Sequence, residues 1–167
     1  MPQPITIRKV FLQPGFVCLP AEESVLCAVA SSGVICTMYD ERRKRGGMGV
    51  YAFPFRQKNK PSTAFFAGPA LFSLFHLLLK DGSCRDDLEA YLYGGAENPL
   101  AAGFSPTFAE TNIRAGKDLL RKFGVKLAGS DLGGRWGRKI AFNSSTGETL
   151  LAKTDKIRET DWYPLLP

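Results

Sequence analysis

Residues 34–39 constrain the fold more than any other part of the sequence. Apolar and β-branched residues fill this segment, and a charged stretch at 40–47 follows it directly. A second apolar segment then occupies residues 48–53. Two such segments joined by a polar turn are typical of a β-hairpin. We therefore expect this hairpin to form part of a β-sheet.

Other segments show strand patterns of the same kind. Single strands are predicted at residues 10–19, 25–30, 88–93 and 125–128, and a second hairpin joins 139–142 to 148–153. Strands outnumber helices and come largely as hairpins, which favours an α+β fold with the helices on one side of the sheets. The length of 167 residues and the absence of an internal boundary predict a single domain over 1–167.

Two helices are expected. The first should have Gly68 as its N-cap and Pro69 at its first helical position, and it should end near residue 80. The second should be capped by Thr111 or Asn112 and stop at Gly124.

The formal net charge of +6 permits an acidic partner without identifying one. The densest basic run, at residues 41–45, falls in the turn of the first hairpin, where we expect it to be solvated. Basic residues are not interleaved with aromatic ones on one face, so we expect no nucleic-acid binding.

We expect a cytoplasmic protein that does not insert into a membrane. The N-terminal residues lack the apolar core of a signal peptide. The longest apolar stretch, 70–79, is interrupted by Ser73 and His76 and is too short to span a bilayer.

The cysteines and the single histidine predict no metal site. Cys18, Cys27, Cys36 and Cys84 lack the paired spacing of zinc or redox sites, and His76 is the sole histidine. We therefore expect neither a metal nor another cofactor.

Several motifs in order resemble one protein family. The sequence from Asp131 reads D-L-G-G-R-W-G-R, and Asn143 begins N-S-S-T-G. This pattern resembles the D-x-G-G-x-x-x-R…N-x-x-T-G run of CheD proteins, the chemoreceptor glutamine deamidases. Residues 46–54 resemble the family's G-A-M-A-H-x-x-L-P segment. The resemblance covers about nine-tenths of the chain.

The resemblance implies a three-layer α/β/β sandwich, similar to the cytotoxic necrotizing factor-type cysteine hydrolases. It also implies a mechanism in which a cysteine attacks the glutamine amide, a histidine transfers the proton and a threonine assists. In this chain the cysteine position falls on Gly33, the histidine position on Val50 and the threonine position on Cys27. Glycine cannot attack and valine cannot move a proton, so we expect no catalytic residue at these positions. The missing side chain at Gly33 should leave the old cleft open at its floor.

Four residues near Gly33 are candidates to replace the missing nucleophile. On a regular strand Cys36 and Ser32 would face away from Gly33, whereas Ser31 and Cys27 would share its side. Cys27 is the better nucleophile, but a thiol needs a base or a lowered pKa. Ser31 and Ser32 are expected to line the vacated site and to take part in binding.

The first predicted helix carries a second candidate surface. Phe72, His76 and Leu79 lie on a face that the core-facing leucines do not occupy, where we expect a protein partner or a second copy of the chain to bind. By the resemblance, the partner is a chemoreceptor helix or a CheC-type phosphatase.

Three functions remain open at this stage. The chain is a catalytically inactive CheD-like protein-binding module of chemotaxis, an active deamidase with a relocated thiol such as Cys27, or a regulatory or structural subunit unrelated to chemotaxis.

Overall fold

The hairpin expected at residues 34–53 forms the centre of the fold. The computed structural model describes residues 1–99 and 105–162. In it, β4 (Val34–Asp40) pairs antiparallel with β5 (Arg45–Tyr51) on one side and with β6 (Leu88–Gly94) on the other. The sheet is completed by β2 (Val17–Cys18) beside β5 and by β7 (Lys126–Leu132) parallel to β6, in the order β2-β5-β4-β6-β7.

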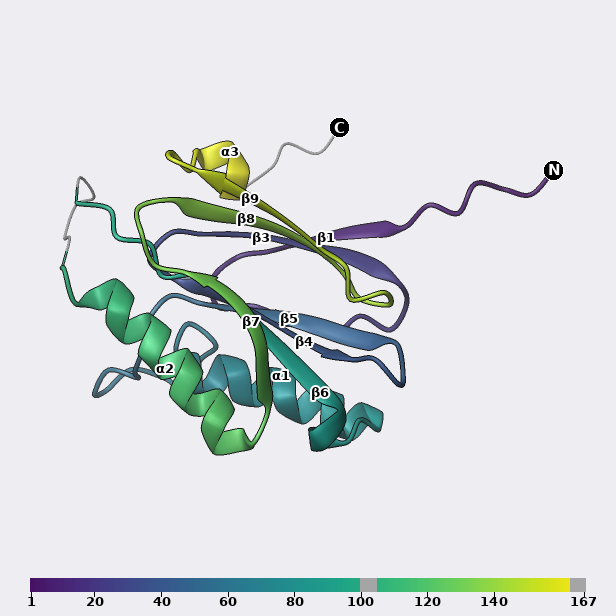
Figure 1. The fold of residues 1–167 in the computed structure, drawn as a ribbon, viewed down its shortest axis with the longest axis horizontal. Coiled ribbons are helices and arrows are strands. Elements are labelled where there is room, and N and C mark those ends of the chain that lie inside the picture. The colour runs from purple at the N-terminus through teal and green to yellow at the C-terminus, as the bar shows by residue number, and fades with distance from the viewer. Residues whose placement is uncertain (100–104, 163–167) are drawn as a thin grey trace.

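A second sheet of four strands packs against the first (Figure 1). Its strands are β1 (Arg8–Leu12), β3 (Ser24–Ala30), β8 (Gly137–Asn143) and β9 (Thr149–Thr154), in the order β1-β3-β8-β9. The hairpin predicted for β8 and β9 is confirmed by their antiparallel register.

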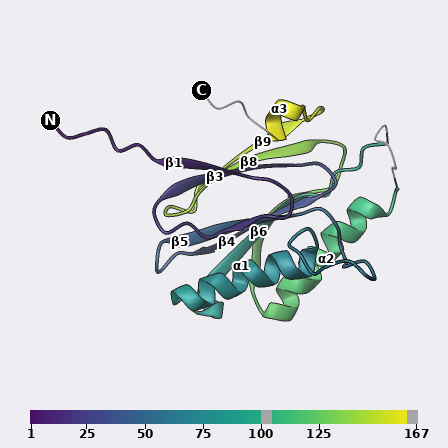
Figure 2. The ribbon, with the colours of Figure 1, turned by 180° about the vertical axis from the view of Figure 1, so that it is seen from behind.

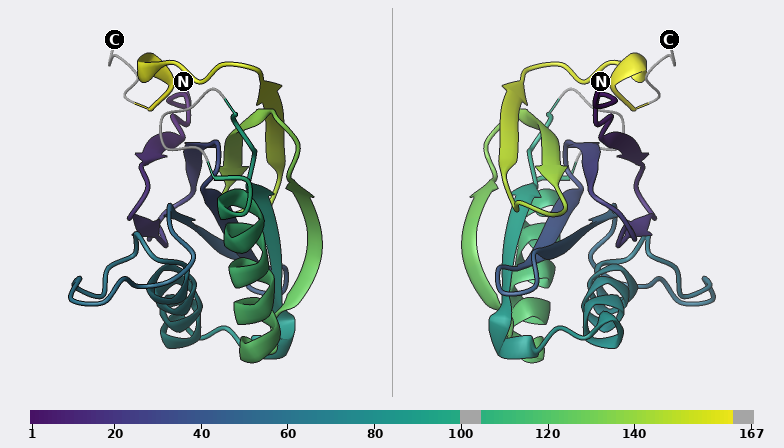
Figure 3. Two further views of the ribbon diagram at one scale, coloured as in Figure 1. Left: turned by 90° about the vertical axis from the view of Figure 1, so that its left-hand side faces the viewer. Right: turned by 90° about the vertical axis from the view of Figure 1, so that its right-hand side faces the viewer.

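The helices α1 (Ala67–Asp81) and α2 (Phe108–Phe123) both cover the free face of the five-stranded sheet, as Figure 1 and the reverse view in Figure 2 show. They lie side by side in one layer (Figure 3). The short helix α3 (Glu159–Trp162) lies over the outer face of the four-stranded sheet, and the 3-10 turn η1 (Arg85–Asp87) precedes β6. The predicted three-layer α/β/β sandwich is confirmed.

Strand β4 shows why two cores form. Its residues alternate between the two faces of the sheet. Val34, Cys36 and Met38 pack with the buried leucines of α1, whereas Ile35 and Tyr39 pack between the two sheets. Every residue of β4 is buried because both faces of the central sheet are covered.

Some predicted boundaries are wrong. The strand predicted at residues 10–19 is two strands in different sheets, separated by a turn in which Gly15 has φ +93°. Helix α1 has Phe66 rather than Gly68 as its N-cap, and α2 has Thr107 rather than Thr111 or Asn112.

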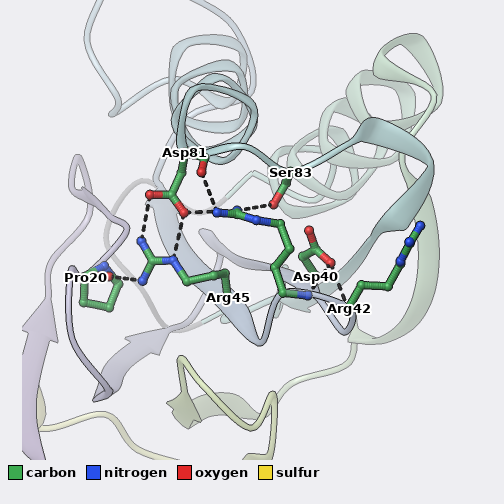
Figure 4. A network of polar contacts seen from close by, with 7 residues as sticks. Pro20, Asp40, Arg42, Arg45, Asp81 and Ser83 are labelled. Atoms are coloured by element: carbon green, nitrogen blue, oxygen red, sulfur yellow. Dashed lines mark hydrogen bonds and ion pairs between the residues drawn. The ribbon is translucent and has the colours of Figure 1, made fainter.

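The basic turn between β4 and β5 is not simply solvated. Arg45 donates from Nε and Nη2 to the carboxylate of Asp81 at 2.8 and 3.2 Å, and Arg43 donates to the same carboxylate at 3.1 Å (Figure 4). These contacts attach the tip of the hairpin to the C-terminal end of α1.

No helix within residues 1–99 and 105–162 is both long enough and apolar enough to cross a membrane.

Candidate functional site

The structure brings Gly33 and Val50 together at one end of the central hairpin. Gly33 immediately precedes β4, and Val50 pairs with Ile35 in the β4–β5 ladder. Both residues line a cavity of about 130 Å³, which Ser31 and Ser32 also line. The two residues that the resemblance predicts at the cysteine and histidine positions therefore share one small site.

The side chains that line this cavity offer no general base. Besides Gly33 and Val50 they are Pro14, Val29, Ala30, Ser31, Ser32, Tyr51 and Ala52. Tyr51 donates its hydroxyl to the backbone oxygen of Asn112 at 2.6 Å, and burial raises its pKa above the ordinary value. A serine hydroxyl needs a neighbouring base to become a nucleophile. Among the described residues that line the cavity, none can supply one.

The backbone of residues 31–33 is nevertheless held firmly. The oxygen of Ser31 accepts from the N–H of Ala96 at 2.7 Å, and the oxygen of Gly33 accepts from the N–H of Gly95 at 2.9 Å. Between them, the oxygen of Ser32 accepts from Nδ2 of Asn112 at 2.9 Å. Three successive carbonyl groups are thus fixed by neighbours distant in the sequence.

Asn112 is the residue that sequence reasoning missed. It lies on the second turn of α2, is fully buried, and donates from Nδ2 to Ala52 as well as to Ser32. It therefore joins the segment before β4 to the segment after β5. A signal was present in the sequence, because Asn112 shares a helical face with the small residues Ala115 and Gly116.

The space in front of Gly33 is closed, contrary to the expected open floor. A Cβ atom added to Gly33 would lie 2.7 Å from the backbone oxygen of Tyr51 and 3.5 Å from Cα of Ala52. The cavity lies beside this direction and does not extend along it. Gly94 is confined in a similar way, because its Cβ would lie 2.2 Å from the oxygen of Gly33.

Cys27 does not share this site. It is half-buried in β3 and lines a different cavity of about 390 Å³ on the outer face of the four-stranded sheet, with Phe11, Ala141 and Leu150. The parity argument is wrong because β3 ends at Ala30 and the chain then crosses to the other sheet. Burial raises the pKa of the Cys27 thiol, although Lys9 partly opposes this effect.

Cys36 is no better placed as a nucleophile. It is completely buried in the core between the helices and the central sheet. Burial alone raises the pKa of its thiol to about 12.

The D-x-G-G-x-x-x-R motif has a structural role. Arg138 in β8 has only 3% of its surface exposed and donates from Nη2 to the carboxylate of Asp131 in β7 at 2.8 Å. It also donates to the backbone oxygens of Gly133 and Trp136. Lys153 in β9 approaches the second oxygen of Asp131 at 3.2 Å. The motif therefore joins β7, an edge strand of the central sheet, to β8 of the second sheet.

The electrostatics of Asp131 agree with this role. Burial raises the pKa of its carboxyl, but the hydrogen bonds from Arg138 and Lys153 outweigh that effect. The pKa is consequently lowered, and the group is a carboxylate at neutral pH.

The second candidate surface, on α1, lies away from this cavity. Phe72 is 53% exposed and stacks on the exposed His76, with ring centroids 5.6 Å apart and an interplanar angle of 11°. Leu79 is half-buried. These residues do not line the cavity at Gly33.

Comparison with known proteins identifies similar sequences over most of the chain. The family model described as "CheD chemotactic sensory transduction" matches residues 53–153, a segment that begins after Val50. A relative from Trichlorobacter lovleyi is 32% identical over 88% of this chain and 91% of its own length. One from Maridesulfovibrio salexigens is 30% identical over 90% and 94%, and one from Methanococcus vannielii is 31% identical over 76% and 83%. Each carries the name probable chemoreceptor glutamine deamidase CheD.

Proposed function

This chain belongs to the CheD family, and we propose that it is a catalytically inactive member that works as a protein-binding, regulatory module in chemotaxis signalling. Its binding surface is the face around Gly33 and Val50, and its partner is a chemoreceptor helix or a CheC-type phosphatase. The names of its relatives motivate the assignment to chemoreceptors.

The observation that carries the proposal is the chemistry of the cavity shared by Gly33 and Val50. Hydrolysis of a glutamine amide through a thioester needs a thiolate to attack the carbonyl carbon. It also needs an acid to protonate the departing ammonia and a base to activate water. The described residues lining the cavity provide two serine hydroxyls, one engaged tyrosine and no such acid or base. Loss of a nucleophile costs about a millionfold in a well-studied protease, and the residual acceleration is roughly a thousandfold over water.

The fixed backbone around the cavity favours binding of a partner. Asn112, Gly95 and Ala96 fix the carbonyl groups of residues 31–33 without requiring a catalytic side chain. A rigid, preorganised surface loses less conformational entropy when a partner binds.

Exposed aromatic residues are hydrogen-bonded through their backbones to residues that line the Gly33 cavity. Phe16 accepts a backbone hydrogen bond from Val50 at 3.0 Å, and Phe65 accepts one from Ala52 at 2.9 Å. The side chains of Phe16, Phe53 and Phe65 are all exposed. Exposed aromatic clusters are typical of protein interfaces, where aromatic residues often provide much of the binding energy.

The test combines a chemical assay with a binding assay. Purified protein is incubated with soluble chemoreceptor fragments, and glutamine-to-glutamate conversion is followed by mass spectrometry and by ammonia release. We expect binding without conversion, and weaker binding for Phe65→Ser, with the exposed Leu150→Ser on the opposite sheet as the matched control. Conversion that disappears in Cys27→Ala would overturn the inactive assignment. Absence of binding to receptor fragments and to a CheC-type phosphatase would overturn the partner assignment.

A further inference from the structure

We propose that a groove in the helical layer is a second binding site, and that it takes an acidic amphipathic helix of a partner protein. The groove has a volume of about 350 Å³ and is formed by α1, α2 and the segment that follows β5. Its lining residues do not overlap with those of the Gly33 cavity. The proposal therefore stands independently of the function proposed for that cavity.

Most residues that line the groove are apolar and form its floor. Pro69 and Leu119 line this apolar floor, and Phe55 also lines the groove with 65% of its surface exposed. Gly68 has no neighbouring atom within 4 Å of a Cβ position, so the surface of α1 is open there. An apolar side chain of a ligand can approach the backbone of α1 at this point.

The apolar surface continues along α1 beyond the groove. Gly68, Phe72 and His76 are spaced four residues apart and therefore lie along one side of the helix. From Gly68 to His76 the helix rises about 12 Å, or roughly two turns. Phe72 also contacts Phe123 of α2 edge to face, with centroids 6.3 Å apart. The combined surface matches the length of a short docked helix.

The rim of the groove is positively charged. Its charged lining residues are Arg56, Lys122 and Asp118, and the two cations form no ion pair within residues 1–99 and 105–162. The nearby carboxylates are already engaged, because Glu110 pairs with Arg114 and Asp118 pairs with Arg121, each at 2.9 Å. A ligand with carboxylates on its flanks would complement this rim.

The concave shape favours a helix over a flat anionic surface. Amphipathic helices commonly bind with their apolar side in a hydrophobic groove. A flat bilayer would reach the exposed Phe55 but not the buried Ala115, which lines the groove. A nucleic acid would pair with the cations and leave the apolar floor without a complementary contact. A helix with leucines on one side and glutamates beside them would pack on the apolar floor and pair with the cations of the rim.

The experiment uses two labelled synthetic peptides of about 18 residues, or five helical turns. Both carry leucines at helical spacing, and the remaining positions are glutamate and alanine in one and lysine and alanine in the other. Binding to the full chain is measured by fluorescence anisotropy at low and at moderate salt. We expect the acidic peptide alone to bind, with an affinity that falls as salt screens the rim.

Two variants and their matched controls locate the site. The double variant Arg56→Glu/Lys122→Glu and the single variant Phe55→Ser should each weaken binding about tenfold or more. Lys156→Glu and Leu150→Ser place the same types of change at exposed positions in or next to the four-stranded sheet, and they should bind like the parent chain. Circular dichroism of each variant checks that it is folded.

Several outcomes would overturn the proposal. Binding of both peptides alike, binding of neither, or equal losses in the groove variants and the controls would each do so. Tighter binding to anionic phospholipid vesicles, or to a single-stranded oligonucleotide, than to the acidic peptide would assign the surface to a different class of partner. Loss of receptor-fragment binding with the groove intact would affect only the function proposed for the Gly33 cavity.

Discussion

Replacing Gly33 by alanine should destabilise the protein, although the residue borders a cavity. Gly33 does not have a positive φ, so the backbone itself accepts a side chain. The obstacle is the oxygen of Tyr51, which would lie 2.7 Å from the new Cβ. Ordinary contacts between carbon and oxygen are longer than about 3.3 Å. Tyr51 pairs with Val34 in the β4–β5 ladder, so it cannot move away without disturbing the sheet.

Two opposing effects set the size of the change. Forcing an extra methyl group into a packed site typically costs about 1–3 kcal/mol. Replacement of glycine by alanine also restricts the unfolded chain, which stabilises a compatible site by about 0.4–1 kcal/mol. The net expectation for Gly33→Ala is a loss of about 1–2 kcal/mol in the free energy of unfolding.

Urea unfolding followed by circular dichroism measures this change directly. Gly68→Ala is the matched control, because nothing lies within 4 Å of its Cβ position in α1. That substitution should stabilise the protein by about 0.5 kcal/mol. A Gly33→Ala variant as stable as the parent chain would refute the inferred clash between the new Cβ and the oxygen of Tyr51. It would also show that the position accepts a side chain without strain.

Three further sets of variants test the junction of the two sheets, the tip of the central hairpin and the vacated site. Arg138→Ala should lower the free energy of unfolding by about 2–4 kcal/mol because it leaves a partly buried carboxylate with one partner, whereas the exposed Lys153→Ala should cost less than about 1 kcal/mol in the same urea experiment. The hydrogen bonds from arginine lower the pKa of Asp81 below 3.8. The stability advantage of the parent over Asp81→Asn should thus be constant above about pH 5 and disappear as the pH falls through the folded-state pKa, measured by urea unfolding across pH. The double variant Gly33→Cys/Val50→His should give slow glutamine deamidation by mass spectrometry; equal activity in Gly33→Cys alone would contradict a role for position 50.

The sequence predicted the features that local pattern determines. The β4–β5 and β8–β9 hairpins were expected because apolar segments flank polar turns, and their antiparallel registers agree. The α/β/β architecture was expected from the CheD resemblance and from the hairpin-rich order of elements. Gly33 and Val50 were expected in one vacated site from the CheD resemblance, and both line the same cavity.

The features that were missed depend on contacts distant in the sequence. Gln13, Pro14 and Gly15 interrupt the apolar pattern of residues 10–19, and the segments on either side of them, β1 and β2, pair with strands of different sheets. Cys27 was placed by counting along a strand, but the crossing between sheets after Ala30 breaks that count. Arg45 was assigned to a solvated turn because its partner, Asp81, lies on another element 36 residues away.

Asn112 shows that the backbone around the site is held in place independently of the catalytic side chains. Its Nδ2 serves Ser32 and Ala52, while its Oδ1 is buried with no hydrogen-bond partner among the described residues. An unsatisfied buried oxygen costs about 1–3 kcal/mol, so the two donated bonds must offset that cost. Both bonds go to backbone carbonyls and would form with any side chain at position 33. The frame can therefore persist when the nucleophile is absent. The contact that excludes a side chain comes from the opposite strand, through the oxygen of Tyr51. The slow activity expected of Gly33→Cys/Val50→His therefore depends on a shift of the β4–β5 backbone that admits the new Cβ.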